Sequence, residues 1–279
     1  MLKDLSLPQS LSATLIALIF LAALGCKEKE GQTSGAEKVV AEDAQSGSEA
    51  SMTKAGPLPG ITPVAHATAV LDWEGTTIYV DPTGGKAAFE NFPLADLILI
   101  TDIHGDHFNL ETLEELETAQ AKIVVPQAVA DQMPESFTPQ LDVLDNGDMK
   151  ERYGITVAAI PMYNLREEAL GFHEKGRGNG YVLEREGRRV YISGDTEDIP
   201  EMRSLEDIDI ALVCMNLPYT MTVESAADAV VAFKPGKVYP YHYRGRPDVS
   251  DVEQFAALVK AGTDAVEVVQ LDWYPGEDY

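Results

Sequence analysis

A short segment of the chain, Asp102-Ile103-His104-Gly105-Asp106-His107, carries imidazole and carboxylate side chains directly after the apolar run 97–100. These groups are costly to bury together at such density unless a cation lies between them. The alternative is an exposed polar loop that caps the following helix. A lone His-x-x-His pair would favour that alternative. The four side chains Asp102, His104, Asp106 and His107 at the end of a strand instead predict a metal site.

The elements that must position this segment are short strands that alternate with helices. Residues 63–73 and 76–82 flank a Glu74-Gly75 turn and are predicted to form a hairpin. Thr222 and Glu224 favour a helix start. Hairpins followed by alternating strands and helices are typical of layered sheets with helices outside, an α/β or α+β fold. Further strands are predicted at 95–100, 122–125, 155–161, 180–185, 188–193, 209–215, 237–242 and 266–271, and helices at 109–120, 128–133, 222–233 and 249–261.

The N-terminal residues have the layout of a secretory signal. Lys3 precedes an apolar run that ends at Cys26 and is short for a membrane span. Its ending, Ala-Ala-Leu-Gly-Cys, resembles a bacterial lipobox, in which the cysteine is lipid-modified. The sequence therefore predicts a lipoprotein signal peptide at 1–25, a flexible tether at 26–59 and a folded domain at 60–279. An uncleaved anchor helix is the alternative, and both place the domain outside the cytoplasm on a bacterial membrane, on its periplasmic or cell-surface side.

The net charge limits the partners that the protein can bind, and the two cysteines limit its disulfide bonding. The 279 residues carry a formal net charge of −25, which repels phosphate backbones and anionic membrane surfaces. We therefore expect a small-molecule substrate, no nucleic acid, and membrane attachment only through the lipid at Cys26. Lipidation of Cys26 would leave Cys214 without a disulfide partner, and Cys214 is predicted to be a buried apolar residue without chemistry.

The segment Asp-Ile-His-Gly-Asp-His resembles the His-x-His-x-Asp-His signature of the metallo-β-lactamase superfamily, with Asp102 in the position of the first histidine. Matching features follow in the family's order: Asp81-Pro82 at a strand end, Asp195 in Tyr-Ile-Ser-Gly-Asp-Thr-Glu-Asp, and His242 in Tyr-Pro-Tyr-His-Tyr-Arg-Gly. The runs His-Ala-Thr-Ala-Val-Leu-Asp-Trp, Ile-Pro-Met-Tyr-Asn and Phe-His-Glu-Lys-Gly-Arg-Gly-Asn-Gly are similar to the branch that includes the L-ascorbate-6-phosphate lactonases. The resemblance covers residues 60–272.

The resemblance implies a four-layer αβ/βα sandwich with two divalent metal ions at one edge between the sheets. Many members place a further histidine after a middle strand, where this chain has Asn164. His173 is the better candidate, because an amide is a poor zinc ligand. One implied ion takes Asp102, His104, His173 and a shared Asp195, and the other takes Asp106, His107, Asp195 and His242.

The implied chemistry is metal-assisted hydrolysis, in which two ions hold a bridging hydroxide that attacks an ester, lactone, amide or phosphodiester. Zinc is the expected ion, although the carboxylate-rich set also admits manganese or iron. Asp106 is implied to orient the nucleophile or pass its proton, and Asp81 to hold a ligand histidine in its tautomer. Arg244 and Arg177 are candidate anchors for an anionic substrate group, with a solvated loop as the alternative for Arg177.

Other interpretations stay open. A non-catalytic metal-binding or scaffold protein is suggested by the departures at Asp102 and Asn164. Redox chemistry at a di-iron centre occurs on the same fold, but the sequence shows no flavin-binding partner domain. Fold does not imply substrate, and the narrower motif resemblance points away from members that cleave antibiotics, so we expect little or no β-lactam hydrolysis. His66 could line the site or be a structural histidine satisfied by the backbone.

Overall fold

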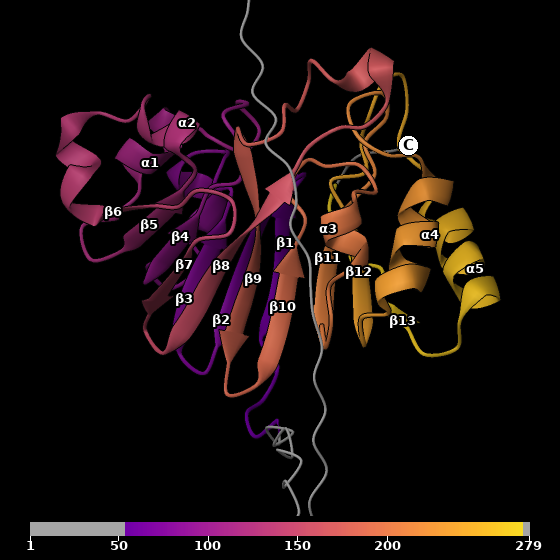
Figure 1. Cartoon of the computed structure of the whole chain (residues 1–279). Coiled ribbons are helices and arrows are strands. Elements are labelled where there is room, and N and C mark those ends of the chain that lie inside the picture. Colours follow the sequence, from indigo (N-terminus) through magenta and orange to yellow (C-terminus); the bar gives the residue numbers. More distant parts are fainter. Residues whose placement is uncertain (1–53, 276–279) are drawn as a thin grey trace, which may run out of the picture. The chain divides into compact units, whose positions relative to one another are not determined.

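The computed structural model describes residues 54–275. The predicted signal peptide, with Cys26, and nearly all of the predicted tether lie outside these residues. Within the described range two mixed β-sheets face each other, and helices cover their outer sides (Figure 1). The first strand begins at Gly60. No helix in this range combines the length and apolar character that crossing a bilayer requires.

The first sheet has the strand order β1-β2-β3-β4-β5-β6. Its first three strands are antiparallel and the remaining neighbours are parallel. The predicted hairpin was wrong in one respect, because residues 63–73 form parts of two strands rather than one. The chain turns at His66, which has a φ of 56°. The strands are β1 (Gly60–Ala65), β2 (Thr68–Trp73), β3 (Thr76–Val80), β4 (Leu97–Leu99), β5 (Lys122–Val125) and β6 (Leu141–Val143).

The second sheet has the order β13-β12-β11-β10-β9-β8-β7. β7 to β10 pair antiparallel, and β10 to β13 pair parallel. The half-exposed edge strand β7 had no prediction, because its Met-Lys-Glu-Arg sequence lacks a strand pattern. The strands are β7 (Met149–Arg152), β8 (Ile155–Met162), β9 (Gly178–Arg185), β10 (Arg188–Ile192), β11 (Ile210–Cys214), β12 (Lys237–Tyr241) and β13 (Glu267–Val268).

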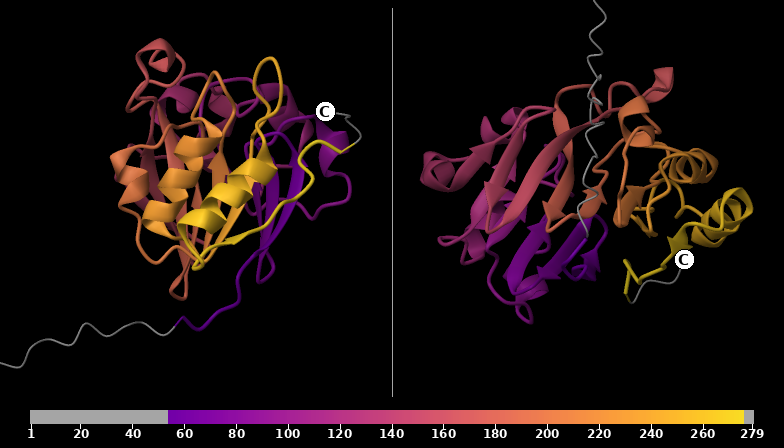
Figure 2. Two further views of the ribbon diagram at one scale, coloured as in Figure 1. Left: turned by 90° about the vertical axis from the view of Figure 1, so that its right-hand side faces the viewer. Right: turned by 60° about the horizontal axis from the view of Figure 1, so that its bottom comes forward.

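The helices are short except for two that lie side by side against the second sheet (Figure 2). The predicted start at Thr222 is confirmed, since its Oγ1 accepts the Ser225 N–H at 3.1 Å. The predicted helix 109–120 is shorter, and it ends at Glu115. The α-helices are α1 (Leu110–Glu115), α2 (Gln127–Ala130), α3 (Pro200–Arg203), α4 (Val223–Phe233) and α5 (Val252–Gly262), and the 3₁₀ turns are η1 (Lys86–Phe89), η2 (Glu135–Gln140) and η3 (Glu167–Ala169).

Alternation along the buried strands divides the core into two parts. In β4, Leu97 and Leu99 join the large cluster shared with the second sheet and its helices, whereas Ile98 belongs to the smaller cluster with Leu113 of α1 and Val129 of α2. Because successive side chains of a strand point to opposite faces, one apolar run serves both layers.

The layered arrangement brings several strand ends to one edge. Asp81 follows β3, Asp102 follows β4, Asp195 follows β10 and His242 follows β12. Their carboxyl ends meet at this edge because these strands belong to the parallel parts of the sheets, and such an edge is where α/β folds bind ligands. The predicted α/β or α+β four-layer sandwich is confirmed.

Candidate metal centre

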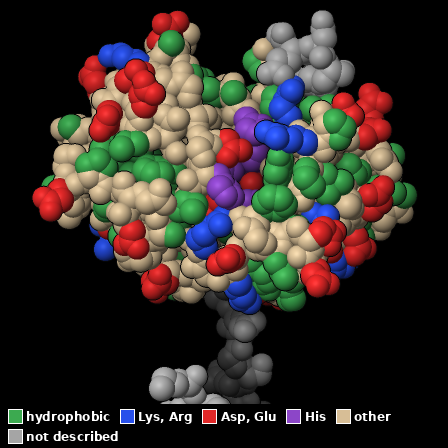
Figure 3. All heavy atoms as spheres, turned by 90° about the horizontal axis from the view of Figure 1, so that it is seen from above, with side chains coloured by type: hydrophobic (Ala, Val, Ile, Leu, Met, Phe, Trp, Pro, Cys, Tyr) green, Lys and Arg blue, Asp and Glu red, His purple; other side chains and the backbone are tan. Residues whose placement is uncertain are grey.

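All five histidines of the chain gather at this edge of the sandwich. Seen from above, histidine side chains line a hollow with acidic side chains among them and basic side chains at its rim (Figure 3). The hollow is a pocket of about 420 Å³, and His66, His104 and His173 line it. His107 and His242 are fully buried.

Asp195 links two groups of histidines. Its Oδ2 lies 3.1 Å from His173 Nε2, and its Oδ1 lies 3.1 Å from His242 Nε2. His107 Nε2 lies 3.4 Å from Asp195 Oδ2 and 3.2 Å from His242 Nε2. The carboxylate therefore lies among three imidazoles, with Oδ1 toward His242 and Oδ2 toward both His173 and His107, a central position that suits a ligand shared by two ions.

Hydrogen bonding does not account for the approaches that His173 and Asp195 Oδ1 make. Neither ring nitrogen of His173, nor Asp195 Oδ1, has a hydrogen-bond partner within the described residues, although all are buried. Buried polar atoms are normally paired, and lone pairs that converge without hydrogen bonds fit a cation between them. The donor set of imidazole nitrogens and carboxylate oxygens suits a divalent transition metal.

The residues also form compact sets whose ligand atoms lie within 4.8 Å of one another. Each of two sets holds three of the four ligands predicted for one ion, and a third set joins His66 to Asp106 and His242. The sets are Asp102, His104 and His173; His107, Asp195 and His242; and His66, Asp106 and His242.

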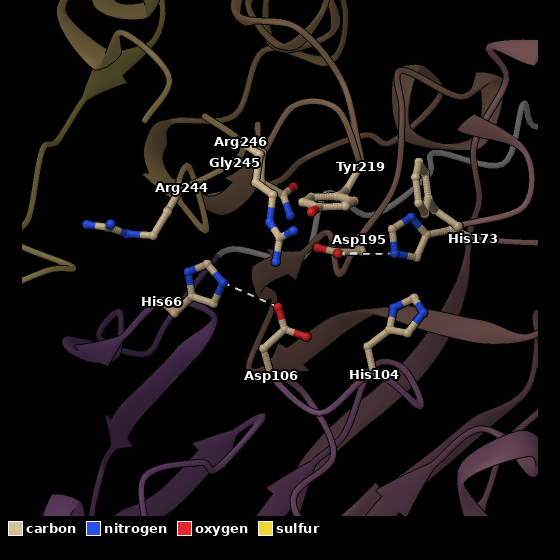
Figure 4. A pocket seen from close by; sticks show the side chains of 11 residues that line it. His66, His104, Asp106, His173, Asp195, Tyr219, Arg244, Gly245 and Arg246 are labelled. Atoms are coloured by element: carbon tan, nitrogen blue, oxygen red, sulfur yellow. Dashed lines mark ion pairs between the residues drawn. The ribbon is translucent and has the colours of Figure 1, made fainter. Parts of the chain in front are cut away.

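Asp106 lies at the pocket's floor between two histidines. Its Oδ2 is 3.3 Å from His66 Nε2 and 3.5 Å from His242 Nε2. Burial would raise the pKa of Asp106, but the hydrogen bond from His66 and the charges of His107 and His242 outweigh it and lower the pKa. Asp106 is therefore a carboxylate at neutral pH. Figure 4 shows His66 and Asp106 facing each other across the pocket.

Asp195 is an anion for a similar reason. Burial opposes its charge, but the imidazoles of His242, His107 and His173 hold its pKa well below the usual range. Either protonated imidazoles or a metal ion would compensate the buried charge.

Asp81 holds His107 from behind. Asp81 Oδ2 lies 2.8 Å from His107 Nδ1 and accepts the Thr101 hydroxyl at 2.7 Å, and Asp81 Oδ1 accepts the Thr101 N–H at 2.8 Å. A carboxylate on Nδ1 leaves Nε2 as the nitrogen for a metal, and this is the role that the resemblance implied for Asp81. Asp81 and His242, like His66, adopt positive φ, with values of 44° and 46°. Such non-glycine strain, which costs about 1–3 kcal/mol for each residue, is concentrated at functional sites.

The two candidate substrate anchors have different surroundings. Arg177 forms a two-point ion pair with Asp102 at 3.0 and 2.8 Å, so its guanidinium is engaged within the protein. Arg244 lines the pocket, and its guanidinium lies 4.6 Å from the centre of the Tyr274 ring. In Figure 4 Arg244 turns away from Asp106.

Sequence reasoning missed Arg246. Its side chain points into the pocket above Asp106 and beside Asp195 (Figure 4), and its guanidinium has no acceptor or carboxylate partner within residues 54–275. Its backbone N–H donates to Leu217 O at 2.8 Å. The packing beside it is tight, because a Cβ on Gly245 would lie 1.6 Å from the same oxygen. The Arg-Gly-Arg sequence beside His242 was the available signal.

Of the two readings left open for His66, the structure supports a place in the pocket. His66 reaches the pocket through the turn between β1 and β2, and its Nδ1 lies 2.9 Å from the Tyr274 hydroxyl. Phe172 and Tyr219 form an edge-to-face aromatic wall, with ring centres 5.1 Å apart. Asn164 stays in the interior, where its amide donates to backbone oxygens of Ala169 and Tyr219.

The comparisons with known proteins agree with this fold and site. The family model described as β-lactamase superfamily domain matches residues 60–242. A UPF0173 metal-dependent hydrolase from Pyrococcus abyssi is 33% identical over 211 residues, which cover 72% of this chain and 90% of the relative. A relative with the same description from Thermococcus onnurineus is 35% identical over 210 residues, with the same coverage of both chains.

Solved structures show the same architecture. A proposed metal-dependent hydrolase from Parabacteroides distasonis has a TM-score of 0.67 and 35% identity, covering 76% of this chain and 92% of that one. A metallo hydrolase from Ignicoccus hospitalis has a TM-score of 0.65 at 24% identity, covering 78% of this chain and 96% of that one, and it shows the fold alone. This chain belongs to the metallo-β-lactamase superfamily.

Proposed function

We propose that this metal-dependent hydrolase of the metallo-β-lactamase superfamily uses a dinuclear site to cleave an ester, lactone, amide or phosphodiester bond in a small molecule. The observation that supports two ions is the split contact of Asp195, with one oxygen toward His173 and the other toward His242. One ion would be held by His104, His173 and Asp195, beside the further expected ligand Asp102, and the other by Asp106, His107, Asp195 and His242. The expected ion is zinc, with manganese or iron as alternatives.

When bound, the ions would supply Lewis acidity and a nucleophile derived from water at neutral pH. The protein's own contribution is to position and charge the groups around that nucleophile. Asp106 is a carboxylate that lies in the pocket and lines it together with His66, so it can accept a hydrogen bond from a nucleophile or receive a proton. The amide of Asn216 is the polar group next to His242, because Asn216 Nδ2 lies 3.2 Å from His242 Nε2.

The pocket's lining fits a small substrate with an anionic group. Arg246 provides a cation at the rim, and Phe172 and Tyr219 provide an aromatic wall beside the acidic floor. A volume of about 420 Å³ is in the range of small-molecule sites. In a chain with a net charge of −25, a cation that has no carboxylate partner among residues 54–275 is a favourable place for a carboxylate or phosphate of the substrate.

We further propose that the domain works outside the cytoplasm, tethered through lipid on Cys26. The apolar run and the Ala-Ala-Leu-Gly-Cys ending support this location. In cells labelled with a radioactive fatty acid, the wild-type chain should incorporate label and partition into the membrane fraction. Cys26→Ser should abolish both, whereas Cys214→Ser should not. A Cys26→Ser protein that still acquires lipid would contradict the anchor.

A scaffold without turnover is the second candidate, favoured by the ion pair that occupies Asp102. The test is elemental analysis of the full chain together with turnover of a panel of esters, lactones, amides and phosphodiesters. We expect about two ions per chain, fewer in His173→Ala and in His242→Ala, and no change in the exposed control Asp264→Ala. Metal content without turnover of any panel member would favour the scaffold, and a chain that takes up no zinc, manganese or iron would refute the hydrolase.

A further inference from the structure

Asp102 stands where the superfamily signature has its first histidine, but its contacts differ from those of a metal ligand. Its carboxylate is fully buried. Oδ1 accepts from Arg177 Nε at 3.0 Å, and Oδ2 accepts from Arg177 Nη2 at 2.8 Å. Oδ2 also lies 2.8 Å from His104 Nδ1. Both oxygens are therefore already engaged by donors of the protein itself.

The contact between Asp102 and His104 repeats the one between Asp81 and His107. In each pair a fully buried carboxylate oxygen lies 2.8 Å from the Nδ1 of an imidazole. Such a bond places the proton on Nδ1, fixes the ring's orientation and leaves Nε2 free for a metal. His104 lies at the pocket beside His173, with ring centres 5.1 Å apart (Figure 4). The ring nitrogen that His104 offers to an ion is thus Nε2.

The charge of Arg177 argues in the same direction. A divalent ion bound to Asp102 would lie next to a guanidinium that holds both oxygens of the same carboxylate. Like charges at contact distance in a buried site repel strongly. Arg177 is itself fixed, because its Nη2 also donates to the Phe172 carbonyl. The pair is neutral as a whole, and burial of a paired carboxylate is far less costly than burial of a lone one.

We propose that Asp102 is a positioning residue that holds His104 through Nδ1 and is neutralised by Arg177, and that it does not bind metal directly. This inference rests on the proposed metal-dependent function. It leaves the first ion with His104 Nε2, His173 and Asp195, whereas the second ion has Asp106, His107, Asp195 and His242. Three protein ligands leave an open coordination position. The first site therefore binds its ion more weakly than the second.

An asparagine at position 102 distinguishes hydrogen bonding to His104 from metal binding. An amide oxygen can still accept the His104 Nδ1–H, but an amide is a poor metal ligand. In Asp102→Asn alone, the amide NH₂ would face the N–H donors of Arg177. The variant is therefore made together with Arg177→Gln, and the two substitutions together leave the net charge unchanged. The glutamine side chain can still donate to the Phe172 carbonyl. Asp102→Ala removes the acceptor altogether and serves as the comparison.

The full chain, stripped of metal, is equilibrated with buffered free zinc, and bound ions are counted by mass spectrometry. Cobalt binding, followed by its visible absorption, reports the ligand set. We expect two zinc ions in wild type, and two in Asp102→Asn/Arg177→Gln with first-site affinity within about fivefold and an unchanged cobalt spectrum. Asp102→Ala, His104→Ala and His173→Ala should each bind only the second ion at the same free zinc. Wild type should also fill in two distinguishable steps.

Other outcomes are decisive. If the double variant loses the first ion as fully as His104→Ala does, Asp102 is a ligand and the proposal is wrong. If wild type binds a single ion that His104→Ala leaves in place, His104 is not a ligand and the proposal is also wrong. A wild-type chain that binds no ion removes the proposed function itself, which distinguishes that failure from a failure of the Asp102 assignment.

Discussion

The substitution Asp81→Asn should weaken the second metal site while leaving the fold in place. The carboxylate of Asp81 accepts three hydrogen bonds, from the Thr101 N–H and hydroxyl and from His107 Nδ1. An asparagine has only one acceptor oxygen. The backbone N–H of Thr101 cannot reverse its role, so it keeps that oxygen, and the amide NH₂ then faces His107 Nδ1. His107 must place its proton on Nε2, the nitrogen that the metal requires.

The magnitudes follow from these contacts. Loss of a carboxylate that orients a ligand histidine typically costs 10–100-fold in metal affinity, or about 1.4–2.7 kcal/mol. The charge-assisted bond to Thr101 becomes a neutral one, a loss of about 1 kcal/mol. A domain of this size is expected to be stable by about 5–15 kcal/mol, so the variant should fold.

The assay is competition for zinc with a chromophoric chelator, combined with urea unfolding of the metal-free chain. Asp96→Asn is the matched control, since Asp96 Oδ2 likewise accepts a backbone N–H, that of Thr77 at 2.8 Å. The control should lose similar stability but no zinc affinity. If Asp81→Asn binds two zinc ions as tightly as wild type, the tautomer argument is refuted.

Three further predictions concern other parts of the molecule. Arg246→Gln should raise KM for anionic substrates about tenfold or more and leave KM for uncharged substrates unchanged. The control Arg189→Gln, near the start of β10 and away from the pocket, should change neither KM, and equal effects of Arg246→Gln on both substrate classes would contradict the anchor role. Gly245→Ala should destabilise the chain by about 1–3 kcal/mol in urea unfolding, because its Cβ would overlap Leu217 O, and Gly60→Ala, where nothing lies within 4 Å, should be neutral. Burial raises the pKa of Cys214 to about 12, so its thiol stays protonated at pH 8. Iodoacetamide should therefore modify Cys214 only after denaturation, and labelling of Cys214 in the native chain would show that the thiol is accessible.

Much of the architecture could be predicted because local patterns carried it. The apolar run before Asp102 and the helix start at Thr222 depend on nearby residues, and both elements formed as expected. The turn at His66 could not be predicted, since a positive φ at a non-glycine residue has no local signature.

The residues of the candidate site could be predicted where they lie close together in the sequence, and their long-range contacts could not. His104, Asp106 and His107 are close together in the sequence, so their spacing alone indicated a metal site. The pairing of Arg177 with Asp102 joins residues 75 positions apart and depends on how the loop before β9 meets the end of β4. The position of Asp102 in the signature and its carboxylate predicted a metal ligand, and that assignment stays a prediction. Only the three-dimensional contacts show that the guanidinium of Arg177 already holds this carboxylate.

The candidate ligands come from both sheets, so bound metal would also affect how long the domain resists degradation. His104, Asp106 and His107 follow β4 of the first sheet, whereas Asp195 and His242 follow strands of the second. An ion held by both groups acts as a cross-link between the two halves of the sandwich. Ligand binding at a hundred times its dissociation constant stabilises a fold by about 2.7 kcal/mol. When free metal is scarce, the halves would separate more readily and expose the chain to proteases, so its abundance would record metal availability.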